Sequence, residues 1–251
     1  MLNKILITGS SKGVGKEVAR IFHENNWHVC LTSRDLLELQ KVKKELKQGD
    51  SQILDFEVDF TKKDQVLALN QYLKKEWGDL DSIILNVGSG SGEKNITSTY
   101  QDNERIFYKN FYAAINTVQL LKDLLNKSKN PIIIFIGSIA ALKNVKSPIN
   151  YAMAKKSIEN YAKSMSIKYA DLGVRVNCVH LGHVLTQGGI WEKKLKQDPI
   201  NLKKFIDENT LTKEIVTPES VAEFIYSLHS ESYSKFMSGS NILFDAGTSL
   251  V

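Results

Sequence analysis

Tyr151 and Lys155 lie four residues apart, in a long amphipathic run that follows a strand-like segment ending in Gly137-Ser138. Residues four apart share one face of a helix, so the phenol and the ammonium can meet beside the Ser138 hydroxyl. A free tyrosine ionises near pH ~10, and a neighbouring cation lowers that pKa. Together the three residue types could exchange a proton with a substrate at neutral pH. The same spacing also occurs where an exposed tyrosine lies over a lysine stem, so the rest of the chain must decide.

Apolar, β-branched segments alternate with helical patterns along the whole chain. The strand-like segments span 4–8, 28–33, 52–58, 81–86, 131–137, 174–180 and 241–244, and the helical patterns span 14–26, 35–48, 62–77, 102–127, 149–171 and 218–229. Such alternation predicts βα units with right-handed crossovers. The expected fold is therefore α/β, a doubly wound parallel sheet in a Rossmann-like three-layer α/β/α sandwich, formed as one domain by residues 1–251. Sites in this architecture lie at the carboxyl ends of the strands.

The composition argues against several other classes of protein. The 251 residues are 42% apolar, enough for one full core, and the net charge of +5 comes from 33 basic and 28 acidic residues that are mixed along the sequence. No basic stripe interleaved with aromatic residues indicates nucleic-acid binding, and no apolar segment approaches the ~18 residues that would span a membrane. With no cleavable signal, a cytoplasmic protein is expected. Cys30 and Cys178 lie in apolar strand-like segments, so neither a disulfide nor a metal site is expected.

The turn after the first strand-like segment carries three glycines and leads into a helical pattern. Glycines let backbone N–H groups approach a pyrophosphate, and the N-terminus of a helix adds positive potential. The spacing, Gly-x-x-x-Gly-x-Gly, differs from the common Gly-x-Gly-x-x-Gly dinucleotide motif, but an ordinary tight turn would not need three glycines. We therefore expect a dinucleotide site here. Its expected residues are Gly9, Ser11, Lys12, Gly13, Val14 and Gly15.

The second strand-like segment ends in Ser33 and Arg34, at the place where a cofactor with a free ribose 2′-hydroxyl would favour a carboxylate. A carboxylate would repel a 2′-phosphate, whereas the planar guanidinium of Arg34 can bind one, and Lys12 adds a second cation on that side. We therefore expect NADP(H) rather than NAD(H), with Ser33 and Arg34 at the ribose phosphate. Surface pairing of Arg34 with Asp35 is the alternative.

These motifs, with others in the same order along the whole chain, resemble the short-chain dehydrogenase/reductase family in its single-domain form. Thr8 to Gly15 is similar to its Thr-Gly-x-x-x-Gly-x-Gly loop, and Tyr151 to Lys155 is similar to its Tyr-x-x-x-Lys motif. The resemblance implies a catalytic set of Asn110, Ser138, Tyr151 and Lys155. It implies cofactor contacts at Asp59 beside the adenine, and at Phe60, Asn86, Gly88, Tyr151, Lys155, Gly182, Val184 and Thr186.

Some segments depart from the family pattern or extend it. Leu85 and Val87 replace the first Asn and the Ala of its Asn-Asn-Ala-Gly stretch, and Leu181 replaces the Pro of its Pro-Gly-x-x-x-Thr motif, but no reacting group is lost. Segment 88–95 is glycine-rich and polar, and could be either a surface loop or a polar substrate-binding loop. Residues 187–216 resemble the substrate lid of the family and have the pattern of short amphipathic helices.

The resemblance implies hydride transfer between a nicotinamide and a carbonyl or alcohol carbon. In that mechanism Ser138 donates a hydrogen bond to the substrate oxygen, and Tyr151 delivers or accepts its proton. Lys155 lowers the tyrosine pKa and holds the nicotinamide ribose, and Asn110 positions a water. The leading hypothesis is an NADP(H)-dependent oxidoreductase that reduces a carbonyl, or oxidises a secondary alcohol, of a small, polar metabolite.

Three alternatives remain open. They are a sugar or nucleotide-sugar enzyme of surface-carbohydrate synthesis, a 3-oxoacyl reductase, and a cofactor-binding sensor or scaffold without turnover. His180 and His183 fall near the site, where a packed or solvent-facing histidine is more common than a catalytic one. A homo-oligomer, either a tetramer or a dimer, is expected partly from the resemblance and partly from an apolar face in pattern 149–171, which could instead be core packing. That face consists of Ile158, Tyr161, Ala162, Met165 and Tyr169.

Overall fold

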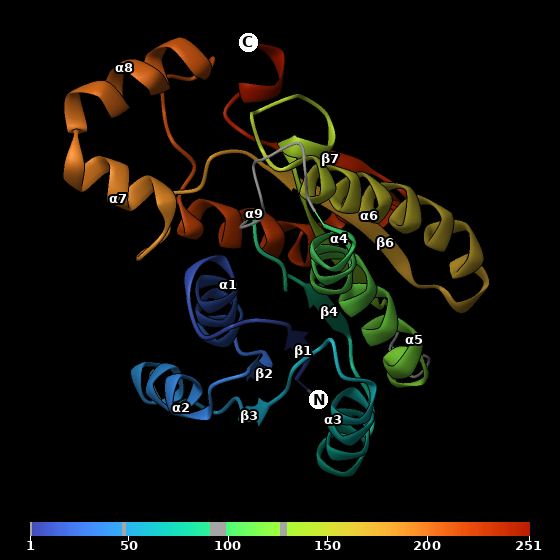
Figure 1. Ribbon diagram of the computed structural model, residues 1–251. Helices are drawn as coiled ribbons and strands as arrows, with labels where there is room; N and C mark the ends of the chain where they lie inside the picture. The colour runs from blue at the N-terminus through green and yellow to red at the C-terminus, as the bar shows by residue number, and fades with distance from the viewer. Residues whose placement is uncertain (1, 47–48, 91–98, 126–129) are drawn as a thin grey trace.

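A seven-stranded parallel sheet lies at the centre of the computed structural model, which describes residues 2–46, 49–90, 99–125 and 130–251 (Figure 1). The strands are β1 (Lys4–Ile7), β2 (His28–Ser33), β3 (Ile53–Glu57), β4 (Ser82–Leu85), β5 (Ile132–Ser138), β6 (Arg175–Leu181) and β7 (Asn241–Phe244). Their spatial order is β3-β2-β1-β4-β5-β6-β7. Strands β1 to β3 extend the sheet toward one edge, and β4 to β7 extend it toward the other. The order of the strands therefore switches between β1 and β4, which is the point where doubly wound sheets bind ligands.

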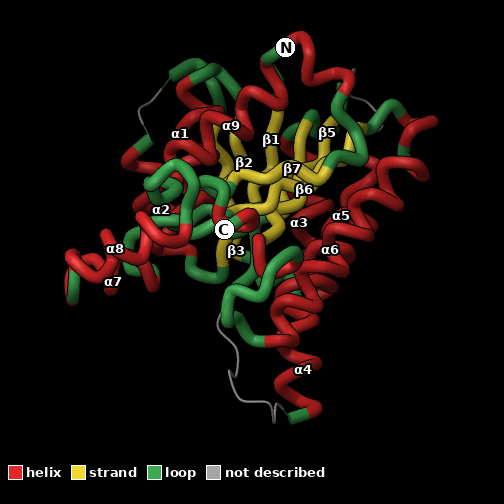
Figure 2. Tube along the Cα trace, turned by 90° about the horizontal axis from the view of Figure 1, so that it is seen from above, coloured by secondary structure: helices red, strands yellow, loops and turns green. Residues whose placement is uncertain are grey.

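Helices cover both faces of this sheet (Figures 1 and 2). They are α1 (Gly13–Glu24), α2 (Leu36–Glu45), α3 (Lys63–Glu76), α4 (Tyr100–Phe107), α5 (Ala113–Leu125), α6 (Ile149–Lys168), α7 (Ile190–Gln197), α8 (Pro199–Asn209) and α9 (Pro218–Ser230). Helices α1, α2 and α9 share one hydrophobic core with residues such as Ile7 and Leu31. Helices α3, α5 and α6 share a second core, around Phe135, on the other face. The predicted three-layer α/β/α sandwich is confirmed.

The helical pattern 102–127 differs most from its prediction. The helix begins earlier, at Tyr100, because Thr99 and Asp102 form a capping box. A π-helical turn, Tyr108–Tyr112, then separates α4 from α5. Residues 126–127 of the prediction lie outside the described residues. Turns of this kind often occur at functional sites, and this one carries Asn110.

The apolar face of α6 is covered within the chain. Ile158, Ala162 and Met165 are buried in the core, and Tyr161 and Tyr169 pack against it. Helix α6 lies on β5 and β6 and also contacts α4 and the π-helical turn, so more than one of its sides is packed. The face that the sequence offered as a possible subunit contact is therefore core packing.

Helices α7 and α8 project from the layered body of the protein, as Figures 1 and 2 show. They confirm the short helices expected within 187–216. Their base is fixed by a parallel bridge between Val184 and Val216, and the Leu185 N–H donates to the Val216 carbonyl at 2.8 Å. None of the described helices is both long enough and apolar enough to cross a membrane.

Candidate active site

The loop between β1 and α1 is shaped by its glycines. Gly9 and Gly13 adopt left-handed φ angles of 71° and 57°, which favour glycine. A Cβ at Gly15 would lie 2.3 Å from the Gly9 carbonyl oxygen, so no other residue fits there without a backbone shift. Lys12 occupies the N-cap of α1 without a side-chain capping bond. The first N–H groups of α1 therefore remain open to an anionic ligand, and the loop fits the pyrophosphate of a dinucleotide.

Asn86 joins the end of β4 to this loop. Its Nδ2 atom donates to the Thr8 and Gly9 carbonyls at 3.2 and 3.0 Å, and its backbone N–H donates to Thr8 Oγ1 at 2.8 Å. The same hydroxyl accepts from the Val87 N–H at 3.1 Å and donates to the Ile84 carbonyl at 3.2 Å. Asn86 thus holds the glycine loop against β4. The sequence predicted Asn86 as a cofactor contact but did not show this structural role.

Ser138 and Tyr151 come together at the end of β5 and the first turn of α6. The Ser138 hydroxyl forms a hydrogen bond with the Tyr151 phenol and accepts another from the Ala140 N–H at 3.2 Å. Tyr151 is half-buried. Burial raises the pKa of Tyr151, and the Ser138 hydrogen bond opposes this rise. The phenol therefore keeps its proton at neutral pH, and its partner here is the hydroxyl of Ser138.

Lys155 lies below this pair, one helical turn further along α6. Its side chain is buried, and Nζ donates to the Ile136 carbonyl at 2.8 Å. Burial lowers the pKa of Lys155 to about 8, and only a negative charge on Cys178 would act in the opposite direction. The Lys155 ammonium is hydrogen-bonded to the β5 backbone in this arrangement, and its predicted effect on the tyrosine pKa stays a prediction.

Asn110 reaches the same place from the π-helical turn. It is buried, its Nδ2 atom donates to the Ile106 carbonyl at 3.0 Å, and its Oδ1 atom accepts from the Ser89 N–H at 2.8 Å. A Cβ on Gly88 would lie 2.9 Å from Asn110 Oδ1 and 3.3 Å from Lys155 Nζ. Gly88 therefore lies between the amide and the ammonium, and the four residues of the predicted catalytic set converge. Residues 91–95 of the polar segment 88–95 lie outside the described residues.

Several cations gather on the β2 side of the glycine loop. The side chain of Arg34 is exposed, and within the part of the chain that the structure describes no carboxylate lies at ion-pair distance from it. Lys109, next to Asn110, also faces this region. Burial lowers the pKa of Lys109, and the charges of Arg34, Arg105 and Lys12 lower it further, whereas Asp59 raises it. Lys109 could not be identified from the sequence, because only the fold brings the π-helical turn within reach of the charges of Arg34 and Lys12.

Asp59 and Phe60 follow β3 on the same side. Burial raises the pKa of Asp59, but the hydrogen bonds that Oδ1 accepts from the Thr61 N–H and hydroxyl, at 3.0 and 2.7 Å, and the charge of Arg34 give a lowered value overall. The carboxylate is thus ionised and held in place. The side chain of Phe60 is buried in the core, so its backbone is what remains available to a ligand.

The segment after β6 returns to the glycine loop. A Cβ on Gly13 would lie 3.3 Å from Thr186 Cγ2, so Thr186 faces the start of α1. Gly182 packs on the C-terminal segment, because a Cβ there would lie 2.7 Å from Asp245 Cα. Val184 is half-buried and forms the bridge to Val216. Among these three expected cofactor contacts, the side chain of Thr186 faces the glycine loop.

Aromatic rings of α7 and α8 pack against His183, which follows the end of β6. The His183 ring centroid lies 4.3 Å from that of Trp191 on α7 and 5.5 Å from that of Phe205 on α8, and the Lys194 ammonium lies 4.4 Å from the Trp191 centroid. Burial lowers the pKa of His183 to about 4, and the Lys194 charge contributes to this.

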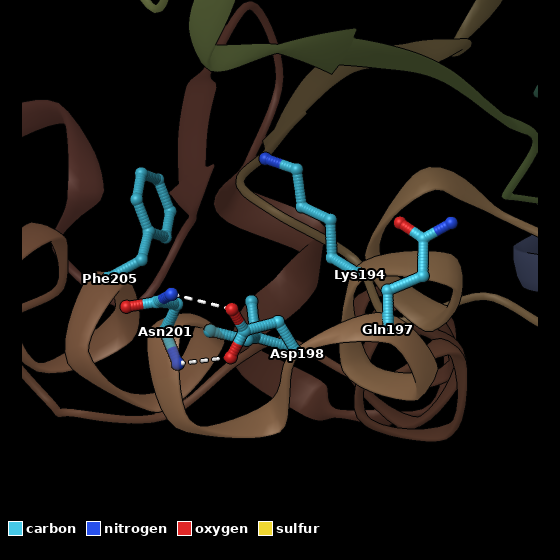
Figure 3. Close-up of a pocket in the computed structure, with 6 residues that line it drawn as sticks. Lys194, Gln197, Asp198, Asn201 and Phe205 are labelled. Carbon is cyan, nitrogen blue, oxygen red and sulfur yellow. Dashed lines mark hydrogen bonds between the residues drawn. The ribbon is translucent and has the colours of Figure 1, made fainter.

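A cavity of about 270 Å³ opens between the two helices (Figure 3). It is lined by Lys194, Gln197, Asp198, Asn201, Leu202 and Phe205. The Asp198 carboxylate caps α8 by accepting from the Asn201 N–H at 3.0 Å, so it is committed to the helix. Among the described residues, no three His, Cys, Asp or Glu side chains are grouped to hold a metal ion, and Cys30 and Cys178 are buried free thiols.

Comparison with known proteins agrees with this geometry. A family model described as enoyl-(acyl carrier protein) reductase matches residues 9–249. Zerumbone synthase of Zingiber zerumbet is 30% identical over 257 residues, covering 98% of this chain and 94% of the relative. Glucose 1-dehydrogenase 2 of Bacillus subtilis is 25% identical, covering 98% and 94%. L-Sorbose reductase from Gluconobacter frateurii, solved with NADPH and L-sorbose, superposes with a TM-score of 0.91 at 24% identity, over 100% of this chain and 98% of that one.

The sequence matches extend over nearly the whole chain and include the segments that form the site. The family model and zerumbone synthase cover the segments that carry the glycine loop, Asn110, Ser138 and the Tyr151–Lys155 pair. The solved structure shares the fold in which these segments are placed. The chain therefore belongs to the short-chain dehydrogenase/reductase family.

Proposed function

We propose that the protein is an NADP(H)-dependent oxidoreductase that interconverts a carbonyl and a secondary alcohol on a small, polar metabolite, with residues 1–251 acting as one unit. The observation that supports this most directly is the hydrogen bond between Ser138 and Tyr151 above the buried ammonium of Lys155. A phenol that retains its proton at neutral pH is a general acid suited to a carbonyl oxygen. A binding protein without turnover would have no need of this set together with Asn110.

The proposed mechanism assigns each residue one task. A bound nicotinamide dinucleotide supplies or accepts the hydride. In the reductive direction Tyr151 donates its proton to the substrate oxygen, and Ser138 donates a hydrogen bond to the same oxygen. The Lys155 ammonium stabilises the phenolate that remains, and Asn110, by holding the Ser89 N–H, fixes the edge of the site beside Gly88. In the oxidative direction the phenolate accepts the proton.

The polar character of the projecting helices supports a polar substrate. The cavity between α7 and α8 combines the apolar surface of Phe205 with the amine of Lys194 and the amides of Gln197 and Asn201. Two relatives, glucose 1-dehydrogenase 2 and L-sorbose reductase, are named for sugar substrates. Others are named 3-oxoacyl-[acyl-carrier-protein] reductase, such as that of Chlamydia trachomatis at 25% identity. Sugars and 3-oxoacyl groups are therefore the first two classes of substrate to test.

A substrate panel tests the function. The purified protein is mixed with NADPH, and absorbance of the reduced nicotinamide is followed with ketoses, small cyclic and open-chain ketones, and a 3-oxoacyl thioester. We expect turnover of at least one carbonyl compound and its dependence on Tyr151. Binding of NADPH without consumption on any member, under conditions in which a related reductase turns over, would favour the sensor or scaffold.

We expect NADPH to bind at least tenfold more tightly than NADH, a difference of about 1.4 kcal/mol that one charge-assisted contact can provide. The exposed guanidinium of Arg34, with Lys12 and Lys109 near it, would bind the 2′-phosphate. The Arg34→Asp variant should reverse the preference. Lys193→Asp, on the exposed surface of α7, changes the net charge equally and should leave the preference unaltered. Fluorescence titration that gave equal affinities for the two cofactors in the parent protein would contradict the assignment.

We also propose a homo-oligomer, a tetramer or a dimer. Support comes from family membership and from exposed apolar side chains on α4, the π-helical turn and the start of α6, which include Tyr108, Tyr112, Ile149 and Met153. Light scattering at micromolar concentration is expected to report a multiple of the 28.3 kDa chain mass. A monomer at that mass would refute the proposal, and Tyr108→Lys should weaken the assembly if this face is buried in it.

A further inference from the structure

The imidazole of His180 is enclosed between the sheet and α6. The residue is fully buried on β6, where it pairs in register with Gly137 of β5. A Cβ on Gly137 would lie 2.6 Å from His180 Nδ1, so the ring occupies the space that this glycine leaves free. From there Nδ1 lies 3.1 Å from the backbone carbonyl of Ser138. A histidine thus contacts the residue whose hydroxyl binds Tyr151.

The other ring nitrogen faces the helix that carries Tyr151. His180 Nε2 lies 3.6 Å from Glu159 Oε2, and both atoms are buried. Glu159 follows Lys155 by four residues and Tyr151 by eight, so the three side chains lie along one face of α6. The second carboxylate oxygen of Glu159 accepts from Lys156 at 2.8 Å. The imidazole therefore lies between the end of β5 and the catalytic face of α6.

Hydrogen-bond chemistry defines what this ring can do. A neutral imidazole donates from one nitrogen only, and a carbonyl accepts but cannot donate, so the contact with Ser138 requires the proton on Nδ1. Burial lowers the pKa of His180, and Lys156 acts in the same direction, whereas the Ser138 carbonyl, the Glu159 carboxylate and the Asn241 amide raise it, with a lowered value overall. The neutral ring with its proton on Nδ1 is thus the form that holds Ser138 at neutral pH.

We propose that His180 is a positioning residue of the reaction, which fixes the Ser138 carbonyl through its Nδ1–H and so directs the Ser138 hydroxyl toward Tyr151. The proposal depends on the catalytic role proposed for Ser138 and Tyr151. Gly137 leaves room for the ring on one side, and Glu159 lies beside its other nitrogen. The hydrogen bond that His180 makes toward the site runs to the Ser138 carbonyl, so we expect it to act through Ser138.

Two amide substitutions separate the nitrogens of the ring. The amide nitrogen of Asn at position 180 can take the place of Nδ1 and donate to the Ser138 carbonyl, whereas that of Gln extends to the place of Nε2 and faces Glu159. Both variants lose the ring and keep one amide. With the carbonyl that the parent reduces fastest in the panel, we expect His180→Gln to lower kcat about tenfold or more and His180→Asn to stay within about threefold of the parent, because misplacement of a reacting group is costly.

A double-variant cycle distinguishes positioning from general packing. If His180 acts through the Ser138 hydroxyl, His180→Gln should cause no further loss of kcat in the Ser138→Ala background. Independent, multiplying losses, or equal losses in His180→Gln and His180→Asn, would overturn the proposal, since a ring that merely fills space would give both. Melting temperature and NADPH affinity, measured in parallel, should be similar in the two single variants.

Two readouts do not depend on turnover. Nitrogen NMR of the imidazole, assigned by its loss in His180→Asn, is expected to show the proton on Nδ1 at neutral pH, and a proton on Nε2 alone would overturn the proposal. The Ser138 hydrogen bond lowers the pKa of Tyr151. An ultraviolet titration, corrected with Tyr151→Phe, should therefore show ionisation of Tyr151 at higher pH in His180→Gln than in the parent. If no carbonyl compound is reduced, the proposed function fails while these two measurements still decide the inference.

Discussion

The Tyr151→Phe variant is expected to lose turnover by a factor on the order of 10³, within the usual range for removal of a general acid. The ring would remain packed at the first turn of α6, and only the hydroxyl that meets Ser138 would be lost. Affinity for NADPH should change little, because the glycine loop, Arg34 and the start of α1 are left intact. Single-turnover absorbance measurements give the loss in rate, and fluorescence titration gives the affinity.

Tyr169→Phe is the matched control for this experiment. Tyr169 ends the same helix, is partly buried against the core, and lies eighteen residues from the site. Its hydroxyl has no role in the proposed chemistry, so the variant should turn over at nearly the parental rate. Robust reduction by purified Tyr151→Phe, on any compound that the parent reduces, would show that the proton comes from another group.

The parts of the fold that follow from local pattern could be predicted from the sequence. A strand buried on both faces, such as β5, is nearly continuous in apolar residues, and its neighbours along the chain are amphipathic at helical spacing. The same holds for the glycine loop, where a Cβ at Gly15 would lie 2.3 Å from the Gly9 carbonyl oxygen. Tyr151 and Lys155 could be placed on one face of a helix because their spacing sets the geometry.

Contacts between distant segments could not be predicted in the same way. The π-helical turn that aims Asn110 has the same apolar pattern as a continuous helix, so the sequence indicated one helix over 102–127. Lys109, on the π-helical turn, comes within reach of the charge of Arg34 only through the fold. The apolar stripe of α6 looked large enough for a subunit contact, because the sequence does not show that the π-helical turn and α4 also cover this helix.

The protonation states of the site residues were the property least predictable from the sequence, because they depend on the fold. From sequence, Lys155 appeared as a fully charged neighbour of Tyr151, whereas burial lowers its pKa to about 8 and directs it to the Ile136 carbonyl. The proximity of His180 to Ser138 likewise depends on the register that pairs it with Gly137. A spacing in sequence identifies which groups are present, but burial and register decide which protons they hold.

Replacement of Lys155 by Met is therefore expected to affect both function and stability. Turnover should fall by a factor on the order of 10² or more, because the phenolate of Tyr151 loses the nearby ammonium, and NADPH affinity should fall as well. Lys163→Met, on the exposed side of α6, is the matched control and should alter neither. Unchanged turnover in Lys155→Met would contradict the proposed role of the ammonium.

The stability of the Lys155→Met variant should differ from that of the parent in a pH-dependent way. The pKa of Lys155 falls from 10.5 to about 8 on folding, so between these pH values the unfolded chain binds a proton that the folded protein does not. The free energy of unfolding of the parent should therefore rise, relative to that of the variant, by about 3 kcal/mol between pH 7 and pH 10.5. Denaturant titrations of both proteins across this range measure the difference. A constant difference would mean that Lys155 keeps its ordinary pKa in the folded protein, and that its charge is not held in the site at the expense of stability.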